Sequence, residues 1–228
     1  MTVAAQTIIK TVVLDIIVDP TSVRWPIDEI ARYFNDGQRD IIVHRPDAQV
    51  VTTSIALVAG TKQSLPSAAT KLMDIPRNTS GSKRAITKAP MSLLNEQIPG
   101  WHALAGAAEI LHFTYDERDD HTFYVYPPAL NTASVEATYA AVPTDITPPN
   151  PGQLWSDVTG NMSLPDIFAG AMQNYIAYRC YAKDSEMASN ASRATAHYQL
   201  YANDLGVELK ATQGVAPVTA MGMRPTGG

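Results

Sequence analysis

The spacing of apolar residues predicts a helix close to the start of the chain. Between residues 7 and 19 the apolar side chains fall in pairs, at Ile8 and Ile9, Val12 and Val13, and Ile16 and Ile17. A repeat of four lines one face of a helix, whereas a half-buried strand would alternate every second residue. We therefore expect a helix rather than a strand, ended by Asp19-Pro20.

A second helix is expected from Trp25-Pro26 to Arg45-Pro46. Proline fits the first turn of a helix because its missing N–H has no partner there, and Asp28 and Glu29 suit the positive end of the helix dipole. Gly37, in the middle of this segment, lowers helix propensity by about 1 kcal/mol relative to alanine. A close contact between helices is one reason for a glycine here, and the sequence leaves its role open.

Two more helices are expected near the other end of the chain. Ser163 and Asp166 have the spacing of a capping box and predict a helix start. A fourth helix is expected near residues 188–205, with Gly206 as its stop. Five tyrosines give these two helices an aromatic seam, at Tyr175, Tyr178, Tyr181, Tyr198 and Tyr201. Core packing is the preferred interpretation of the seam, and a subunit interface is the alternative.

Between Gln49 and Val142 the pattern changes to short runs that alternate or are rich in β-branched residues. These predict strands at residues 50–58, 71–76, 84–88, 109–115, 122–126 and 134–141. The polar residues 115–121 lie between two of the runs and indicate a hairpin connection. The proline-rich residues 143–152 indicate a stiff extended link.

The order of these elements predicts an α+β fold. Its simplest form is a four-helix bundle, built from the N- and C-terminal helical pairs, with an inserted antiparallel β subdomain and an extended C-terminal tail. The predicted segments are residues 1–48 and 153–210 for the two helical pairs, 49–152 for the β subdomain and 211–228 for the tail.

The last eighteen residues have four glycines, two prolines and one charge, without a helical or strand period. Such a segment does not fold by itself, but it could extend close to about 60 Å and dock on a partner or a neighbouring subunit. Docking would use apolar side chains in pockets or the addition of a strand to an open sheet edge. The predicted binding residues are Val215, Val218, Met221, Met223 and Arg224. The alternative is a terminus that binds nothing.

Composition narrows the classes of function. The net charge is −5, from 17 Lys and Arg against 22 Asp and Glu, which disfavours a protein that reads nucleic acid. The charged fraction of 17% is low and predicts a surface that is largely neutral, as in a protein that buries its outside against neighbours. Cys180 is the only cysteine, which excludes an internal disulfide and a four-thiolate zinc site. No signal peptide or membrane-length apolar run is seen, so a soluble protein without a membrane partner is expected.

One cluster has the residue types of a metal site: Asp116, Glu117, Asp119, Asp120 and His121. Its spacing does not fit a calcium loop, and a solvated hairpin tip is the preferred interpretation. A metal-dependent enzyme or small hydrolase that uses these carboxylates and a histidine is the alternative. The five histidines form no zinc motif; His112 and His121 could face each other across the hairpin, although packing against aromatic neighbours is preferred.

Other catalytic motifs are absent from the sequence. There is no GxSxG, GxxxxGK[ST] or GxGxxG, and Cys180 lies on an apolar helix face where an unreactive thiol is expected. No catalytic, cofactor-binding or metal-binding residue is predicted.

Four sets of residues, in this order and spacing, resemble the tail adaptor proteins of tailed bacteriophages, also called head-to-tail connectors. They are VRWPIDEI at 23–30 with FNDGQ at 34–38 and RPDA at 45–48; LVAGT at 57–61 with LMDIPRN at 72–78; YDERD at 115–119 with TFYVYPP at 122–128; and YRCYAKDSE at 178–186 with RA at 193–194, HY at 197–198 and LG at 205–206. The resemblance covers about residues 20–206.

The resemblance implies a structural protein without catalytic residues. It implies a helical bundle with a β subdomain, assembled as a ring, commonly of twelve copies, in the virion neck. The ring would bind the portal, present a platform for tail or nozzle proteins and let DNA pass through its channel, with the C-terminal segment reaching the portal. Assembly in the host cytoplasm is expected. Another virion part, such as a head-completion or tail-tube protein, is a further alternative.

Overall fold

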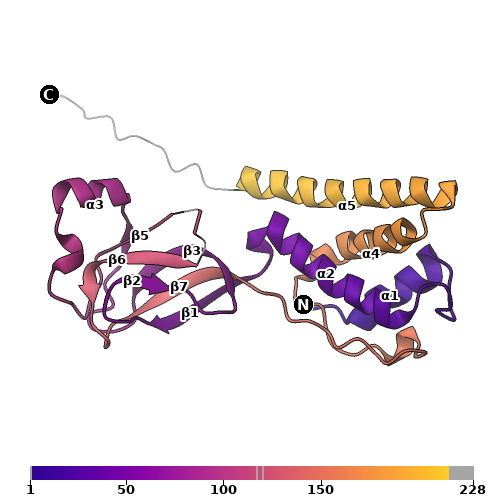
Figure 1. Cartoon of the computed structure of the whole chain (residues 1–228), viewed down its shortest axis with the longest axis horizontal. Helices are drawn as coiled ribbons and strands as arrows, with labels where there is room; N and C mark the ends of the chain where they lie inside the picture. Colours follow the sequence, from indigo (N-terminus) through magenta and orange to yellow (C-terminus); the bar gives the residue numbers. More distant parts are fainter. Residues whose placement is uncertain (1, 117, 120, 216–228) are drawn as a thin grey trace, which may run out of the picture. The chain divides into compact units, whose positions relative to one another are not determined.

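The computed structural model describes residues 2–116, 118–119 and 121–215, and the chain divides into two compact units. A helical unit takes its described residues from Met1–Gly37, Ile146–Met162 and Asp166–Gly228. A β unit comprises Gln38–Asp145 and Ser163–Pro165. The fold is α+β, as predicted, with helices from both ends of the chain in one unit and the strands in the other (Figure 1).

The first apolar repeat forms a helix, which confirms the preference for a period of four. Helix α1 (Ala5–Thr11) continues into a π-helical turn, η1 (Val12–Ile16), so the helix ends before the predicted Asp19. Its buried stripe is formed by Ile8, Ile9, Val12 and Val13, each at most 1% exposed.

Helix α2 (Ile27–His44) agrees with the predicted second helix and passes from the helical unit into the β unit. The backbone carbonyl of Pro26 accepts the N–H groups of Glu29 and Ile30 at its start. A Cβ atom added at Gly37 would lie 2.7 Å from Met172 Sδ and 2.8 Å from Tyr175 Cδ1. Gly37 therefore lies at a close contact of α2 with the helix of Met172 and Tyr175, a role that the sequence left open.

The predicted capping box at Ser163 is wrong. Helix α4 (Ala169–Lys183) begins after a 3₁₀ turn, η5 (Asp166–Phe168), and has no side-chain cap. Ser163 Oγ instead accepts the N–H of Thr144, at 2.8 Å, and donates to the Thr144 carbonyl, at 3.0 Å. Both residues belong to the β unit, so this serine joins two loops rather than starting a helix.

The predicted helix end at Gly206 is also wrong. Helix α5 (Ala188–Val215) continues through Gly206, where an added Cβ would meet nothing within 4 Å. A single glycine costs a helix only about 1 kcal/mol, and that is too little to end it.

Helix α4 contacts α1 and α5 in the helical unit, and α4 and α5 lie side by side (Figure 1). The tyrosine seam joins α4 to α5, with ring centroids 5.3 Å apart for Tyr175 and Tyr201 and 5.2 Å for Tyr178 and Tyr198. The core-packing interpretation of Tyr175 and Tyr201 is confirmed by their burial. The four-helix bundle itself stays a prediction.

The β unit contains two sheets. One has the strand order β1-β7-β3 and the other β2-β6-β5-β4. The strands are β1 (Val50–Ala56), β2 (Gly60–Ser64), β3 (Ala69–Asn78), β4 (Thr87–Lys88), β5 (His112–Tyr115), β6 (Thr122–Ala129) and β7 (Ser134–Ala141). Strand β2 was not predicted. All strand pairs are antiparallel except β4 with β5, which is parallel. The prediction of a wholly antiparallel subdomain is therefore wrong at this pair.

Both sheets contribute to one apolar core. Its members include Leu72, Ile75 and Val135 from the first sheet and Phe113, Phe123 and Val125 from the second. A smaller cluster forms around Trp101, which is fully buried beside Leu94 of an unpredicted short helix, α3 (Met91–Gln97). The remaining short elements are three 3₁₀ turns, η2 (Pro46–Ala48), η3 (Trp101–Ala103) and η4 (Trp155–Asp157). Residues 143–150 lack regular structure, as predicted for the proline-rich link.

Candidate interaction surfaces

The polar residues 115–121 connect β5 to β6, which confirms the predicted hairpin connection. Asp116 pairs with Arg118 at 2.7 Å inside this turn, and the hydrogen bonds from Arg118 lower the pKa of Asp116 to about 2. Glu117 and Asp120 lie outside the described residues. Within the part of the chain that the structure describes, no three His, Cys, Asp or Glu residues are placed to hold a metal ion.

The histidine alternative at this hairpin is wrong. The register of β5 and β6 places Tyr126, not His121, opposite His112, and the two rings stack with centroids 6.0 Å apart. Thr87 Oγ1 lies 2.6 Å from His112 Nδ1. His112 therefore has the packing role that was preferred from its aromatic neighbours.

Cys180 is fully buried in α4, as predicted. Burial raises the pKa of its thiol to about 12, so the thiolate needed for nucleophilic attack does not form near neutral pH. The backbone carbonyl of Cys180 accepts Trp25 Nε1 at 3.0 Å. This residue contributes to packing and to the join between the two ends of the chain.

The predicted binding residues of the tail fall at or beyond the end of the described chain. Val215 is the last residue of α5, and Val218, Met221, Met223 and Arg224 lie outside the described residues. Their role as a docking segment therefore stays a prediction.

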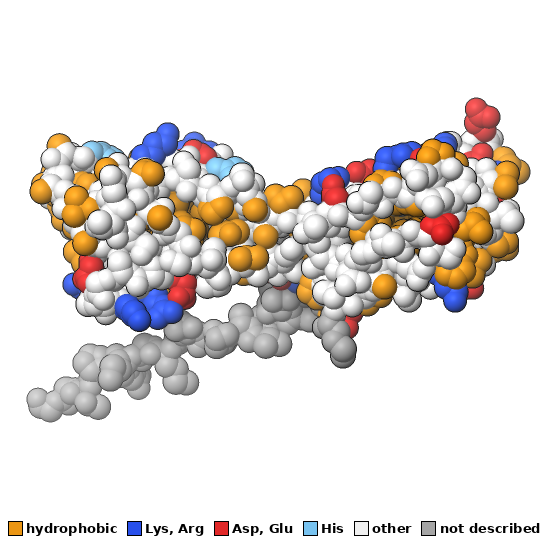
Figure 2. All heavy atoms as spheres, turned by 90° about the horizontal axis from the view of Figure 1, so that it is seen from below, with side chains coloured by type: hydrophobic (Ala, Val, Ile, Leu, Met, Phe, Trp, Pro, Cys, Tyr) orange, Lys and Arg blue, Asp and Glu red, His pale blue; other side chains and the backbone are white. Residues whose placement is uncertain are grey.

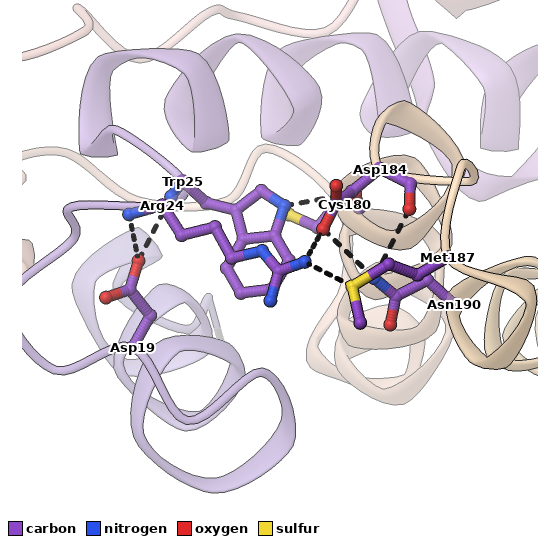
Figure 3. A network of polar contacts seen from close by, with 7 residues as sticks. All are labelled: Asp19, Arg24, Trp25, Cys180, Asp184, Met187 and Asn190. Atoms are coloured by element: carbon purple, nitrogen blue, oxygen red, sulfur yellow. Dashed lines mark hydrogen bonds and ion pairs between the residues drawn. The ribbon is translucent and has the colours of Figure 1, made fainter.

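A loop that the sequence did not single out joins η1 to α2 and is centred on Asp19. Its carboxylate accepts the N–H groups of Val23, Arg24 and Trp25 at 3.3, 2.9 and 3.0 Å. Figure 3 shows the bonds to Arg24 and Trp25. Because hydrogen bonds to a charged acceptor are stronger than neutral ones, a single side chain fixes three consecutive residues. We call residues 17–25 the Asp19 loop.

The far side of the Asp19 loop is bonded to the turn between α4 and α5. Arg24 forms an ion pair with Asp184, and Asn190 Nδ2 donates to the same carboxylate at 3.0 Å (Figure 3). The Arg24 guanidinium also lies 4.8 Å from the centre of the Trp25 ring. These contacts join the N-terminal and C-terminal helices of the helical unit.

The fixed loop exposes two valines. Val18 is 71% and Val23 is 81% exposed, and Val18 has a φ of 53°. A β-branched residue rarely adopts a positive φ, so the loop holds Val18 in a strained conformation. Asp19-Pro20 signals a turn in the sequence, but the three backbone partners of Asp19 become visible only in the structure.

A shallow apolar groove of about 430 Å³ lies in the β unit. It is lined by Arg39, Ile42, Val43, Pro46, Thr70, Lys71, Val142 and Pro143. Val43 is 77% exposed, which is unusual for an apolar residue on an amphipathic helix. The groove is a second place where apolar surface faces solvent.

On the face seen in Figure 2, neutral and hydrophobic side chains cover most of each unit, and charged side chains form small separate groups. This agrees with the low charged fraction of the sequence. Among the described helices, none combines the length and the apolar character needed to cross a membrane.

Comparison with known proteins supplies the family. No curated protein matches the chain. The model of the SU10 adaptor protein family matches residues 3–223, which include both units and nearly the whole chain. The resemblance to phage tail adaptors, seen in four short sets of residues, is thereby confirmed. The chain belongs to the SU10 adaptor protein family, a family of phage tail adaptors.

Proposed function

We propose that this protein is a structural subunit of the phage neck, assembled as a ring that joins the portal to the tail. The observation that carries the proposal is the family match over residues 3–223, because it includes the helical unit and the β unit alike. A match to one unit alone would support a shared fold, not a shared role.

In this proposal the ring has twelve copies, binds the portal on one side and a tail or nozzle protein on the other, and lets DNA pass through its channel. The net charge of −5 supports a channel with a negative wall, which would not bind the DNA backbone and would let DNA slide through. Assembly would take place in the host cytoplasm before the protein becomes part of the virion neck.

Surfaces for such contacts are available in both units. The Asp19 loop holds Val18 and Val23 in fixed, exposed positions, and the groove beside Val43 offers apolar surface in the β unit. Fixed apolar groups lose little conformational entropy on binding, which favours their use as contact residues.

The C-terminal tail is proposed as a further contact with the portal or a neighbouring subunit. Val215, Val218, Met221 and Met223 would supply apolar side chains and Arg224 a charge. Composition supports this proposal, because the segment has too few apolar residues for a core of its own and yet has apolar side chains at Val215, the end of α5, and at Val218, Met221 and Met223 after it.

The alternatives from the sequence gain no support from a specific observation. Asp116 of the hairpin is engaged by Arg118, and Cys180 is buried with a raised pKa. The matching family is one of adaptor proteins, which favours an adaptor over a head-completion or tail-tube protein.

The test is the native mass of the purified protein with and without the portal. A ring of twelve has twelve times the 24.6 kDa of one chain, and its complex with the portal adds the mass of the portal ring. A protein that stays monomeric with the portal present would sink the proposal. Removal of residues 216–228 should weaken assembly without loss of helical or strand signal, and removal of 225–228 is the control.

A further inference from the structure

The two sheets of the β unit have four edges, and three of them have features that discourage pairing with another strand. Strand β3 contains Pro76 and three irregularities in its register with β7. Strand β2 has an irregularity between Gly60 and Lys62, and β4 has only two residues. Prolines, bulges, charges and short length are the usual means by which proteins protect a sheet edge.

Strand β1 has none of these protections. Its seven residues, VVTTSIA, contain no charge and no proline, and every one of them pairs with β7 without a register shift. Valine, threonine and isoleucine also favour extended backbone. An unprotected edge of this length is a template for an added strand.

The register shows which backbone groups of β1 face outward. The Ala141 N–H donates to the Gln49 carbonyl and the Leu57 N–H donates to the Ala133 carbonyl, which makes residues 49 and 57 hydrogen-bonded partners of β7. Because such pairs alternate in an antiparallel ladder, residues 51, 53 and 55 also bond to β7. Val50, Thr52, Ser54 and Ala56 therefore point their N–H and C=O groups away from the sheet.

These outward groups have no hydrogen-bond partner within the part of the chain that the structure describes. The side chains of the same four residues are exposed. On the opposite face Ile55 is buried, and Val51 packs half-buried against the apolar core, so the core itself reaches this edge. An added strand would gain backbone hydrogen bonds and would cover the rim of the core.

Residues 218–224 of the chain have the properties of such a strand. They lie between Pro217 and Pro225 and comprise seven residues, VTAMGMR, the same number as β1. Proline lacks the N–H that a ladder requires, so the two prolines mark the limits of a strand at this point. Only Arg224 is charged, and Met221 and Met223 fall two residues apart, on one face of an extended chain.

We propose that residues 218–224 of one copy add as a strand to the free edge of β1 in a second copy. Met221 and Met223 would extend the core face beside Val51 and Ile55, and Arg224 would lie on the solvent face with Thr52 and Ser54. This inference rests on the ring proposed above and names the contact through which the tail joins neighbouring subunits.

The register of α4 and α5 shows where the tail begins. Tyr175 lies against Tyr201, and Asn174 Nδ2 donates to Asp204, which sets an antiparallel register between α4 and α5. That register places Ala169, the first residue of α4, opposite about residue 208, so α5 runs about 10 Å beyond α4 before it ends at Val215. The tail thus starts beyond the helix on which α5 packs.

Disulfide trapping between two copies tests the pairing. One copy carries Thr52→Cys, and the other, with a different mass tag, carries a single cysteine at one position from 218 to 224. The native Cys180 does not compete, because it is buried and its pKa is raised to about 12. The two are mixed as monomers, allowed to assemble and oxidised, and the mixed dimer is quantified.

A strand beside β1 predicts a yield that alternates along the tail. Positions 218, 220, 222 and 224 lie on the face of Thr52. The one or two of them that come opposite Thr52 should give about tenfold more mixed dimer than the positions directly before and after, because side chains on opposite faces of a sheet are too far apart for a disulfide. Equal yields at all seven positions would overturn the inference. So would a chain with both cysteines that cross-links only to itself while the two singly substituted copies give no mixed dimer.

A proline at residue 52 gives a second test. Thr52→Pro removes an outward N–H and leaves the bonds of β1 to β7 in place, so it should abolish the alternating cross-link, measured from a cysteine at residue 54 (Ser54→Cys), while Thr52→Val, which keeps the N–H, should not. Rings of unchanged mass without the alternation would refute the strand but leave the proposed function standing. Alternating cross-links in dimers that never form rings would refute the ring alone.

Discussion

The helical unit and the β unit are held together in different ways. In the helical unit, hydrogen bonds and an ion pair join the two ends of the chain: Trp25 Nε1 donates to the Cys180 carbonyl, Tyr181 Oη donates to the Ile16 carbonyl, and Lys183 pairs with Glu29. The β unit is almost one continuous piece of chain, and pairing between its strands holds it together.

Because of this difference, each unit has its own source of stability, and the two units differ in how much of their backbone stays open to a partner. The helical unit needs residues from both ends of the chain. The β unit has a core of its own, and no described residue pairs with the outer edge of β1. We therefore expect the two units to respond independently to changes in their cores, and the following predictions test that expectation.

The largest effects should come from emptying each core in turn. Phe34 in the helical unit and Phe123 in the β unit are both 0% exposed. Phe34→Ala and Phe123→Ala should each cost about 3–5 kcal/mol, from lost burial and the cavity that remains. Hydrogen exchange of backbone amides should show the loss of protection in the substituted unit.

The comparison between the variants carries the test. If the units are independent, Phe34→Ala leaves the protection of β6 and β7 unchanged, and Phe123→Ala leaves that of α4 unchanged. Equal loss of protection in both units, in either variant, would show one cooperative fold and would contradict the separation.

A smaller effect is expected at the close contact of α2 with α4 around Gly37. Gly37→Ala places a methyl group 2.7 Å from Met172 Sδ and 2.8 Å from a Tyr175 ring carbon, and overpacking of this kind costs about 1–3 kcal/mol. Urea unfolding measures the change. The matched control is Gly206→Ala in α5, where the space is open and a gain of about 0.5–1 kcal/mol is expected.

If Gly37→Ala were stabilising by as much as Gly206→Ala, the close approach of α2 to α4 would be wrong. The two variants differ only in what the added methyl group meets, because both positions lie inside helices.

The Asp19 loop gives the next effect. Asp19→Ala removes the acceptor of three backbone N–H groups ahead of α2, and loss of a comparable helix cap costs about 1–2 kcal/mol. Urea unfolding should show the loss, with Asp15→Ala, at an exposed position of the same helix region, as the control. Equal stability of the two variants would contradict the role given to Asp19.

The same difference between units explains how far the sequence could predict the fold. Helices α1, α2 and α4 follow from local periodicity, since the burial of each face is written in neighbouring residues. The end of α5 was missed because one glycine cannot outweigh the continued helix. The capping box predicted at Ser163 was wrong because the hydroxyl of Ser163 bonds to Thr144, a partner that no local sequence pattern reveals.

In the β unit, β2 was missed because two of its buried side chains, Thr61 and Gln63, are polar. Gln63 Nε2 donates to the carbonyls of Val58 and Gly60, so the buried amide is satisfied by its own loop and leaves no apolar alternation to read. The Asp19 network depends on contacts between residues, which only the structure shows. The free edge of β1 depends on strand order, which the sequence does not reveal either.

The smallest expected effect is a dependence on pH that distinguishes the units. Burial, and then Arg193, lower the pKa of His197 in α5 below its ordinary value of 6.5. Its Nδ1 donates to Asn174 Oδ1 at 3.1 Å, and its ring stacks on Tyr181. In the β unit, the hydrogen bonds from Arg45 lower the pKa of Asp47 below 3.8.

Both lowered values stabilise the fold at higher pH, but in different windows. The unfolded chain binds a proton at His197 more readily than the folded chain does, so the contribution of His197 is complete above pH 6.5 and is lost as the pH falls through the lower folded pKa. The contribution of Asp47 is lost only as the pH falls below 3.8.

Hydrogen exchange at about pH 7 and about pH 5, corrected for the intrinsic rate, should therefore show weaker protection of α4 and α5 at the lower pH. His197→Gln should remove that part of the change and leave the β unit as it was. A pH response that is the same in both units, or that persists in His197→Gln, would contradict the assignment to this one side chain.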